Sequence, residues 1–165
     1  MRHTITILVE NEFGVLTRVA GLFSARGYNI ESLNVAPILD KTASRMTLVT
    51  RGDEHVIEQI KKQLNKLIPV IKVEDISHKV HMEREMLLVK LHSEPASHAA
   101  IIKVAEKVRA KIIEDAPESY IILELTGQAD KLDDFLERLG KFDIIEMTRT
   151  GPVGMRRGVK GFTLD

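Results

Sequence analysis

The sequence of 165 residues contains no cysteine, which excludes disulfides, a thiolate nucleophile and a cysteine-ligated zinc site. It has no excess of either charge, because 24 basic residues balance 24 acidic ones. Zero net charge argues against a general nucleic-acid binder and against a membrane-surface protein. Aromatic residues make up only 4%, and no expected strand carries the aromatic-rich run with which sheet proteins stack RNA bases.

Long hydrophobic runs are also missing, and residues 1–4 lead directly into a strand-like segment instead of a signal peptide. We therefore expect a soluble, cytoplasmic protein without a membrane segment. Apolar residues reach 44%, which is enough for real cores. If the chain forms two small domains, each buries only about 60% of its unfolded surface, so each would gain from contact with the other or with another chain.

Hydrophobic periodicity in the first half alternates between strand and helix patterns. The expected order is a strand over 4–10, a helix from 15 to a stop at Gly27, strands over 28–36 and 44–50, a helix from 53 to 67, and a strand over 70–76. This βαββαβ order predicts a ferredoxin-like, four-stranded antiparallel sheet with two helices on one face.

The polar segment 77–83 has no apolar period and is the expected linker. The same order then repeats, with strands over 85–91, 111–115, 120–126 and 142–147 and with helices beginning near Pro95 and Asp130. The fold class is therefore α+β, with two tandem βαββαβ domains. The expected domains are 1–77 and 84–150, followed by a flexible glycine- and arginine-containing tail over 151–165.

The loop over 11–14 joins the first strand to the first helix and offers a candidate ligand site. The free amides of Gly14, Val15 and Leu16 at the helix start suit a carboxylate, and Gly14 allows close approach. The Asn11 side chain offers an acceptor for an ammonium group together with N–H donors. Both groups together describe an amino acid, although an ordinary turn explains the same residues.

Other motifs have simpler explanations. His78 and His81 have a spacing that suits a metal only on a helix, and they lie in the polar linker. The glycines between 151 and 158 could clasp a phosphate, but a flexible tail that docks on a partner or has no role explains them better. The chain has no P-loop, no dinucleotide fingerprint and no serine nucleophile elbow, so no catalytic residue and no metal site are expected.

Several segments resemble a known family. Residues 7–19 (ILVENEFGVLTRV) resemble the opening of an ACT domain, the amino-acid-sensing βαββαβ module. Residues 21–37 (GLFSARGYNIESLNVAP) are similar to the small regulatory subunit of acetohydroxyacid synthase, also called acetolactate synthase. Three further blocks agree with this family, at 44–47, 83–90 and 149–158.

The resemblance implies a non-catalytic chain that activates a large catalytic subunit and confers feedback inhibition by valine or another branched-chain amino acid. The large subunit of this family carries thiamine diphosphate, a divalent metal and flavin. It condenses pyruvate with pyruvate or 2-oxobutyrate and releases carbon dioxide. No cofactor is expected in the present chain.

The resemblance also implies a homodimer with the effector at a two-fold interface between ACT domains. Asn29 and Ile30 from the neighbouring chain would then complete the site, Asn29 through a polar contact and Ile30 against the aliphatic side chain. The residues expected to bind the effector are thus Asn11, Gly14, Val15, Leu16, Asn29 and Ile30. Two alternatives stay open: a stand-alone ACT sensor acting on another enzyme or on transcription, and a small enzyme that uses the sheet face.

Overall fold

The computed structural model describes residues 1–164, which divide into two compact units. The first unit contains residues 1–82 together with the C-terminal segment that begins at Val153, and the second contains Glu83–Pro152. The first unit is therefore discontinuous in sequence. The expected boundaries differ, because they end the first domain at residue 77 and assign 151–165 to a separate tail. Within residues 1–164, no helix combines the length and the apolarity needed to cross a bilayer.

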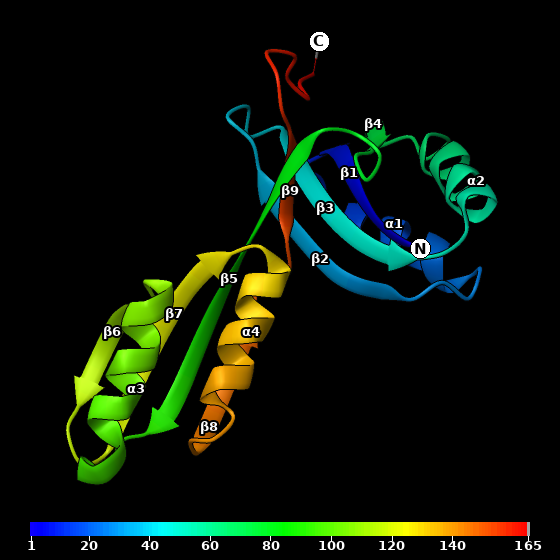
Figure 1. Ribbon diagram of the computed structural model, residues 1–165. Coiled ribbons are helices and arrows are strands. Elements are labelled where there is room, and N and C mark those ends of the chain that lie inside the picture. The colour runs from blue at the N-terminus through cyan, green and yellow to red at the C-terminus, as the bar shows by residue number, and fades with distance from the viewer. Residues whose placement is uncertain (165) are drawn as a thin grey trace. The chain divides into compact units, whose positions relative to one another are not determined.

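The first unit contains the predicted βαββαβ order (Figure 1). Its elements are β1 (Arg2–Glu10), α1 (Val15–Ser24), β2 (Ile30–Pro37), β3 (Ala43–Arg51), α2 (Glu54–Leu64) and β4 (Val70–Asp75). The strands form an antiparallel sheet in the order β2-β3-β1-β4, with β1 and β3 in the interior.

The core of the first unit follows from the period-two alternation of β1. Ile5, Ile7 and Val9 share one face of this strand and are fully buried. They belong to one apolar cluster with side chains of both helices, among them Phe23 of α1 and Ile60 of α2. Both helices therefore pack on the same face of the sheet, as the periodicity predicts.

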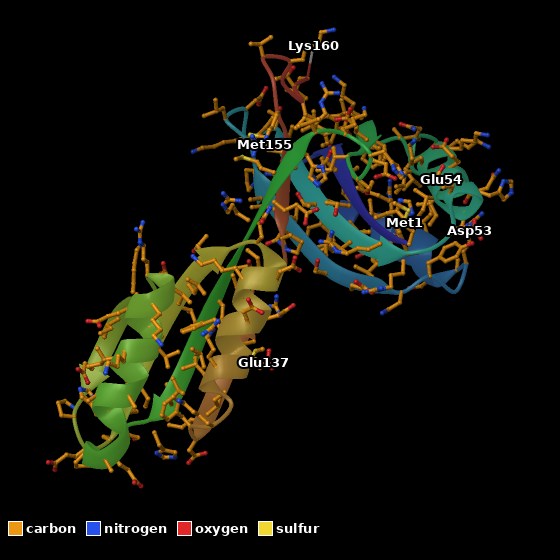
Figure 2. The ribbon with its side chains drawn as sticks, in the orientation of Figure 1. Met1, Asp53, Glu54, Glu137, Met155 and Lys160 are labelled. Carbon is orange, nitrogen blue, oxygen red and sulfur yellow. The ribbon has the colours of Figure 1, made fainter. Side chains whose placement is uncertain are left out.

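The opposite face of β1 is also buried, at Thr4, Thr6 and Leu8. The C-terminal segment lies over this face. It forms β9 (Val153–Arg156), where the Gly154 carbonyl oxygen accepts a hydrogen bond from the Arg45 guanidinium at 2.7 Å. Figure 2 labels Met155 in β9 and Lys160 beyond it.

Side chains on β3 and β4 hold the C-terminal segment further. Arg156 donates to the Glu74 carboxylate at 2.6 Å. The Phe162 ring lies 5.2 Å from the Arg45 guanidinium carbon and 5.6 Å from the Lys72 ammonium nitrogen. The prediction of a flexible tail from residue 151 is therefore wrong for the strand, because its partners lie about 80 to 110 positions away in sequence, beyond the reach of any local pattern.

The second unit repeats the first fold. Its elements are β5 (His81–His92), α3 (Pro95–Val108), β6 (Lys111–Ala116), β7 (Tyr120–Gly127), α4 (Ala129–Leu139) and β8 (Ile144–Arg149). The strand order is β6-β7-β5-β8, and β9 pairs with β5 as an additional member of this sheet. The helices and the sheet share a separate apolar cluster around Phe135 and Leu123. The predicted α+β class with two ferredoxin-like repeats is confirmed.

The boundary between the repeats differs from the predicted linker over 77–83. Strand β5 begins at His81, inside that segment. Its first residues alternate between half-buried and exposed positions and contain no fully buried side chain. A strand without a buried apolar face produces no hydrophobic alternation, so the sequence gives no signal for it.

Candidate functional site

The loop between β1 and α1 is fixed at its first residue. The backbone amide of Asn11 donates to the Thr42 carbonyl at 2.7 Å, and its side-chain Nδ2 donates to the Lys41 carbonyl at 3.0 Å. Both acceptors lie in the turn that joins β2 and β3. The Asn11 side chain therefore uses one N–H within the chain, whereas the sequence predicts that its oxygen and its N–H groups are all available to a ligand.

The turn that receives Asn11 is itself ordered by Asp40. The Asp40 carboxylate accepts hydrogen bonds from the hydroxyl and the backbone amide of Thr42, at 2.7 and 2.9 Å. These two hydrogen bonds hold the pKa of Asp40 below its usual value, and the one from the Thr42 hydroxyl contributes more. The β1–α1 loop is thus supported by a turn whose own conformation is stabilised locally.

Among the residues that the structure describes, no capping side chain and no acidic residue of the first turn offsets the partial positive charge at the N-terminus of α1. Gly14 occupies the N-cap position with φ 79°, no side chain caps the helix, and no acidic residue stands in the first turn. By contrast, Asp53 accepts from the Val56 amide at the start of α2, and α3 has a capping box. The first amides of a helix have no partner within it, so the start of α1 is available to an anion.

Space around this helix start is open. A Cβ atom built on Gly14 would meet no atom within 4 Å. The neighbouring Phe13 is fully exposed, and Leu16 is 42% exposed. Val15, in contrast, is buried in the core, so only its backbone amide could contact a ligand.

Asn29 and Ile30 lie at the other end of the same sheet. Ile30 pairs with Thr50 of β3, whereas Glu10, next to the loop, pairs with Ala43. These two positions on β3 are seven residues apart, which is roughly 24 Å at about 3.4 Å per residue. Within one chain the structure therefore does not bring Asn29 and Ile30 together with the other four predicted site residues.

Asn29 is exposed, and its carbonyl oxygen accepts a hydrogen bond from the Thr50 hydroxyl at 2.7 Å. Its backbone is held while its side chain faces solvent at the start of β2, an edge strand. Ile30 is half-buried and packs against the core. Both residues are accessible from outside the chain, which is the geometry that a second copy requires.

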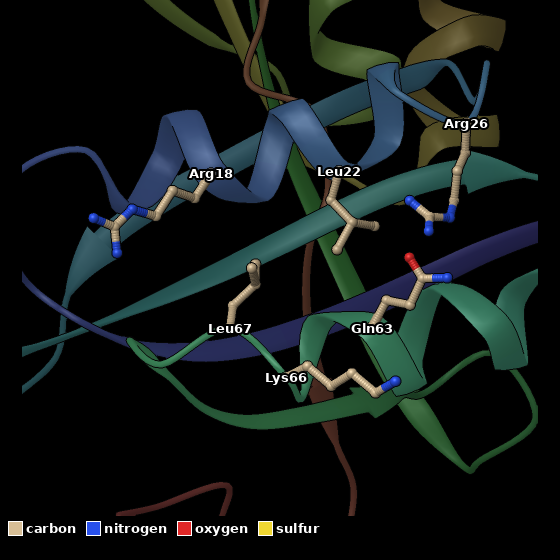
Figure 3. A pocket seen from close by; sticks show the side chains of 6 residues that line it. All are labelled: Arg18, Leu22, Arg26, Gln63, Lys66 and Leu67. Atoms are coloured by element: carbon tan, nitrogen blue, oxygen red, sulfur yellow. The ribbon is translucent and has the colours of Figure 1, made fainter.

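A separate cleft of about 540 Å³ lies between the helices of the first unit. Figure 3 shows Leu22 and Leu67 facing each other across it, with Arg26 and Gln63 pointing toward one another at one end. Its remaining lining residues are Arg18 and Lys66. None of the six predicted residues lines this cleft, which no local pattern predicts because its lining comes from two segments distant in sequence, α1 with the residues that follow it and the end of α2 with the residues that follow it.

Two groups of polar residues that suggest catalysis have structural roles. The Ser93 hydroxyl lies 2.6 Å from Nδ1 of His98, whose Nε2 lies 3.4 Å from the Asp115 carboxylate. Ser93 is fully buried, so its hydroxyl cannot reach a substrate. The glycine-containing segment over 151–158 could bind a phosphate through its backbone amides. The amide of Gly151, however, donates to the Glu85 carboxylate at 3.1 Å, so the chain itself supplies the anion there.

The two histidines of the predicted linker have separate partners. Nε2 of His78 lies 2.7 Å from the Glu54 carboxylate, and Nδ1 of His81 lies 2.6 Å from the Lys79 carbonyl. Their spacing alone therefore does not define a metal site.

Comparison with known proteins agrees with this geometry. Residues 5–72 match the family model described as "AHAS small subunit-like ACT domain", so the first unit defines an ACT-domain protein. Residues 84–158 match the model described as "Small subunit of acetolactate synthase".

Relatives that extend over nearly the whole chain make the assignment specific. The acetolactate synthase isozyme 3 small subunit of Salmonella typhimurium is 48% identical over 97% of this chain and 98% of its own length. The probable acetolactate synthase small subunit of Archaeoglobus fulgidus is 47% identical, covering 97% and 99%. The crystal structure of the acetolactate synthase small subunit from Thermotoga maritima superimposes with a TM-score of 0.88 at 36% identity, over 97% of this chain and 99% of that one. The chain belongs to the family of acetolactate synthase small subunits.

Proposed function

We propose that this chain regulates acetolactate synthase by binding a branched-chain amino acid, with valine as the expected effector. It activates the large catalytic subunit and inhibits it when loaded with effector. Membership of the small-subunit family supports the regulatory role, because relatives of nearly the same length carry that name. The ligand proposal rests on the N-terminus of α1, which has no side-chain cap, and on the space at Gly14, where a Cβ would meet no atom within 4 Å.

The proposed site has separate contacts for the carboxylate, the ammonium group and the side chain of the amino acid. The carboxylate accepts hydrogen bonds from the first amides of α1, at Gly14, Val15 and Leu16, where the helix dipole favours negative charge. The Asn11 side-chain oxygen accepts from the ammonium group, while its N–H continues to hold the loop on Lys41. The exposed part of Leu16 offers apolar surface to the ligand side chain.

The second half of the site comes from a second copy of the chain. Asn29 and Ile30 are about 24 Å from the loop of their own chain, so they can contribute only across an interface between two first units. In a two-fold dimer each loop would face the start of β2 of the partner, and two equal sites would form. Pairing would also cover the exposed edge of β2.

The remaining assignments follow from the regulatory role. Thiamine diphosphate, the divalent metal and the flavin belong to the catalytic subunit, and this chain takes no part in the condensation itself. We place the complex in the cytoplasm, with neither nucleic acid nor membrane as a partner. A stand-alone ACT sensor that acts on another enzyme is the alternative, and it differs in that it needs no large subunit.

Reconstitution tests the proposal directly. The chain is mixed with an acetolactate synthase large subunit, and pyruvate condensation is measured with and without valine, leucine or isoleucine. We expect the chain to raise the rate and valine to lower it again, with no effect of valine on the large subunit alone. An unchanged rate on mixing would refute the regulatory proposal, and activation without inhibition by any of the three amino acids would refute the effector proposal.

A further inference from the structure

Three potential metal ligands converge at one end of the first sheet. His3 lies in β1, Asp75 is the last residue of β4, and His78 lies in the turn that follows. One donor atom from each of them lies within 4.8 Å of the other two. All three belong to the first unit, so their arrangement is independent of the second.

His3 has an unusual deficit of hydrogen bonds. It is 1% exposed, and its Nδ1 lies 2.9 Å from the Asp75 carboxylate. Its Nε2 is buried as well and has no hydrogen-bond partner. Nδ1 is thus the nitrogen that faces Asp75, whereas Nε2, on the far side of the ring, has no partner among the described residues, an exception to the usual pairing of buried polar atoms.

Asp75 is held in place by its neighbours. One carboxylate oxygen accepts from the amide and the hydroxyl of Ser77, at 2.9 and 2.6 Å. The other oxygen faces His3. This carboxylate is therefore oriented before any ligand arrives, which lowers the entropic cost of coordination.

His78 completes the group from the surface. Its ring centroid is 5.9 Å from that of His3, and its side chain is 50% exposed. Nε2 of His78 lies 2.7 Å from the carboxylate of Glu54, which stands at the start of α2 (Figure 2). Metal-binding histidines commonly give their second nitrogen to a carboxylate, and Glu54 stands in that position for His78.

We propose that His3, Asp75 and His78 form a site for a divalent transition-metal ion of the zinc type. Imidazole nitrogen and carboxylate oxygen are ligands that zinc accepts at about 2.0 to 2.2 Å. A tetrahedral ion would bring the donor atoms to roughly 3.4 Å from each other, and the half-exposed His78 can move to close that difference. One buried, one partly buried and one exposed ligand leave a route from solvent, and water would complete the coordination.

The site would fasten the beginning of β1 to the turn after β4. It lies away from the β1–α1 loop of its own chain, because His3 pairs with Thr50 at the opposite end of β3, where Ile30 of β2 pairs with Thr50 from the other side. The alternative is an ordinary buried histidine–aspartate pair. The two differ in their response to zinc.

Zinc binding to the full chain, after treatment with a chelator and dialysis, tests the proposal. The probe is Zn²⁺ alone, measured by equilibrium dialysis against the wild type and the variant His78→Gln. We expect one zinc ion per chain in the wild type, and an affinity at least about 100-fold lower in the variant. His78 is half exposed, so this change leaves the buried pair and the fold in place.

Two histidines serve as controls. His92→Gln removes an exposed histidine of the second unit that stands 3.6 Å from a carboxylate, and His81→Gln removes the other histidine of the predicted linker. Both variants should bind zinc like the wild type, and zinc should raise the melting temperature of the wild type and both controls but not of His78→Gln. A wild type that binds no stoichiometric zinc, or a His78→Gln variant that binds it unchanged, would overturn the proposal.

Discussion

Gly14 combines two properties on which the proposed effector site depends. Its φ of 79° is a left-handed conformation, which favours glycine, and no atom lies within 4 Å of the position that a Cβ would take. A side chain there would be mildly strained but would meet no clash. Substitution at Gly14 therefore tests ligand access more than it tests folding.

We expect Gly14→Asp to weaken valine binding by at least about 100-fold, because placing like charges together costs several kcal/mol. The new carboxylate would occupy the amides at the start of α1 that the ligand carboxylate needs. Isothermal titration calorimetry with valine measures the effect. Gly158→Asp is the matched control, since Gly158 also has a positive φ and open space and lies outside the site. Equal valine affinity in Gly14→Asp and the wild type would contradict the site.

The Glu85–Arg149 pair shows how burial determines the contribution of a charge pair to the free energy of unfolding. Glu85 is 5% exposed and accepts two hydrogen bonds from Arg149, each at 2.9 Å. Asp133 also accepts from Arg149, at 2.6 Å, but its side chain is 60% exposed. The hydrogen bonds that Arg149 donates to the Glu85 carboxylate are the main reason why the pKa of Arg149 is raised.

Glu85→Gln should lower the free energy of unfolding of the second unit by about 2 to 3 kcal/mol, because the buried carboxylate loses charged hydrogen bonds to Arg149 and Gly151. Asp133→Asn should cost less than about 1 kcal/mol, as exposed pairs do. Urea unfolding followed by Tyr120 fluorescence in a Tyr28→Phe background reports on this unit, since the chain has two tyrosines and no tryptophan. Equal costs for the two variants would show that burial is not the deciding factor.

At the level of elements, β9 is a strand whose position depends on a single glycine, Gly154. A Cβ on Gly154 would lie 2.6 Å from Cδ1 of Ile76 and 3.4 Å from Cγ2 of Thr4, both in fully buried side chains. Glycine at this position allows the strand to lie close against the sheet of the first unit. The conformation at Gly154 needs no special φ, so the requirement is one of space alone.

Gly154→Val should destabilise the first unit by about 1 to 3 kcal/mol, the usual cost of inserting extra volume into a packed core. The measurement is urea unfolding followed by Tyr28 fluorescence in a Tyr120→Phe background. Gly161→Val is the control, because its nearest neighbour is the exposed Thr163, which can move. A Gly154→Val variant as stable as the control would mean that β9 does not pack against Ile76 in solution.

The same elements show what a sequence can and cannot predict. Most strands and helices of both repeats follow from apolar periodicity, because they bury one face against their own repeat, as β1 does with Ile5 and Ile7. Strand β9 does not follow from the sequence because it has only four residues, its apolar side chains Val153 and Met155 are exposed, and its buried position is Gly154. Its contacts with Arg45 and Glu74 are long-range and leave no local trace.

The candidate effector site was predictable only in its local part. The loop over 11–14 and the start of α1 are contiguous, so an available helix terminus could be inferred from Gly14 and the apolar period after it. The side-chain bond from Asn11 to Lys41 could not be inferred, because it depends on the β2–β3 turn. The proposed zinc ligands span 75 positions and meet only through sheet register, since His3 and Asp75 lie on neighbouring strands.

At the level of the whole molecule, the proposed effector site needs two chains, and this leads to a complementation experiment. The variants Gly14→Asp and Asn29→Ala each damage one half of a shared site. The Asn29 change preserves the backbone contact with Thr50, because that contact uses the Asn29 carbonyl. Each variant alone should bind valine weakly in both of its sites.

Mixing the two variants and allowing the subunits to exchange should restore wild-type affinity in about a quarter of the sites, since half of the dimers are then mixed and each mixed dimer has one undamaged site. Calorimetry of the mixture measures this fraction, and a mixture of Gly14→Asp with itself is the control. If no high-affinity sites appear although exchange is shown by mass labelling, Asn29 and the β1–α1 loop do not form a shared site across the dimer interface.

The return of the C-terminal segment to the first unit has a consequence for biosynthesis. On the ribosome the second unit, residues 83–152, emerges before the strand over 153–156 that covers the first. The surface at Thr4 and Ile76 therefore stays uncovered until the strand over 153–156 has left the exit tunnel. The first unit is completed only after the second has been synthesised, in reverse of the usual vectorial order.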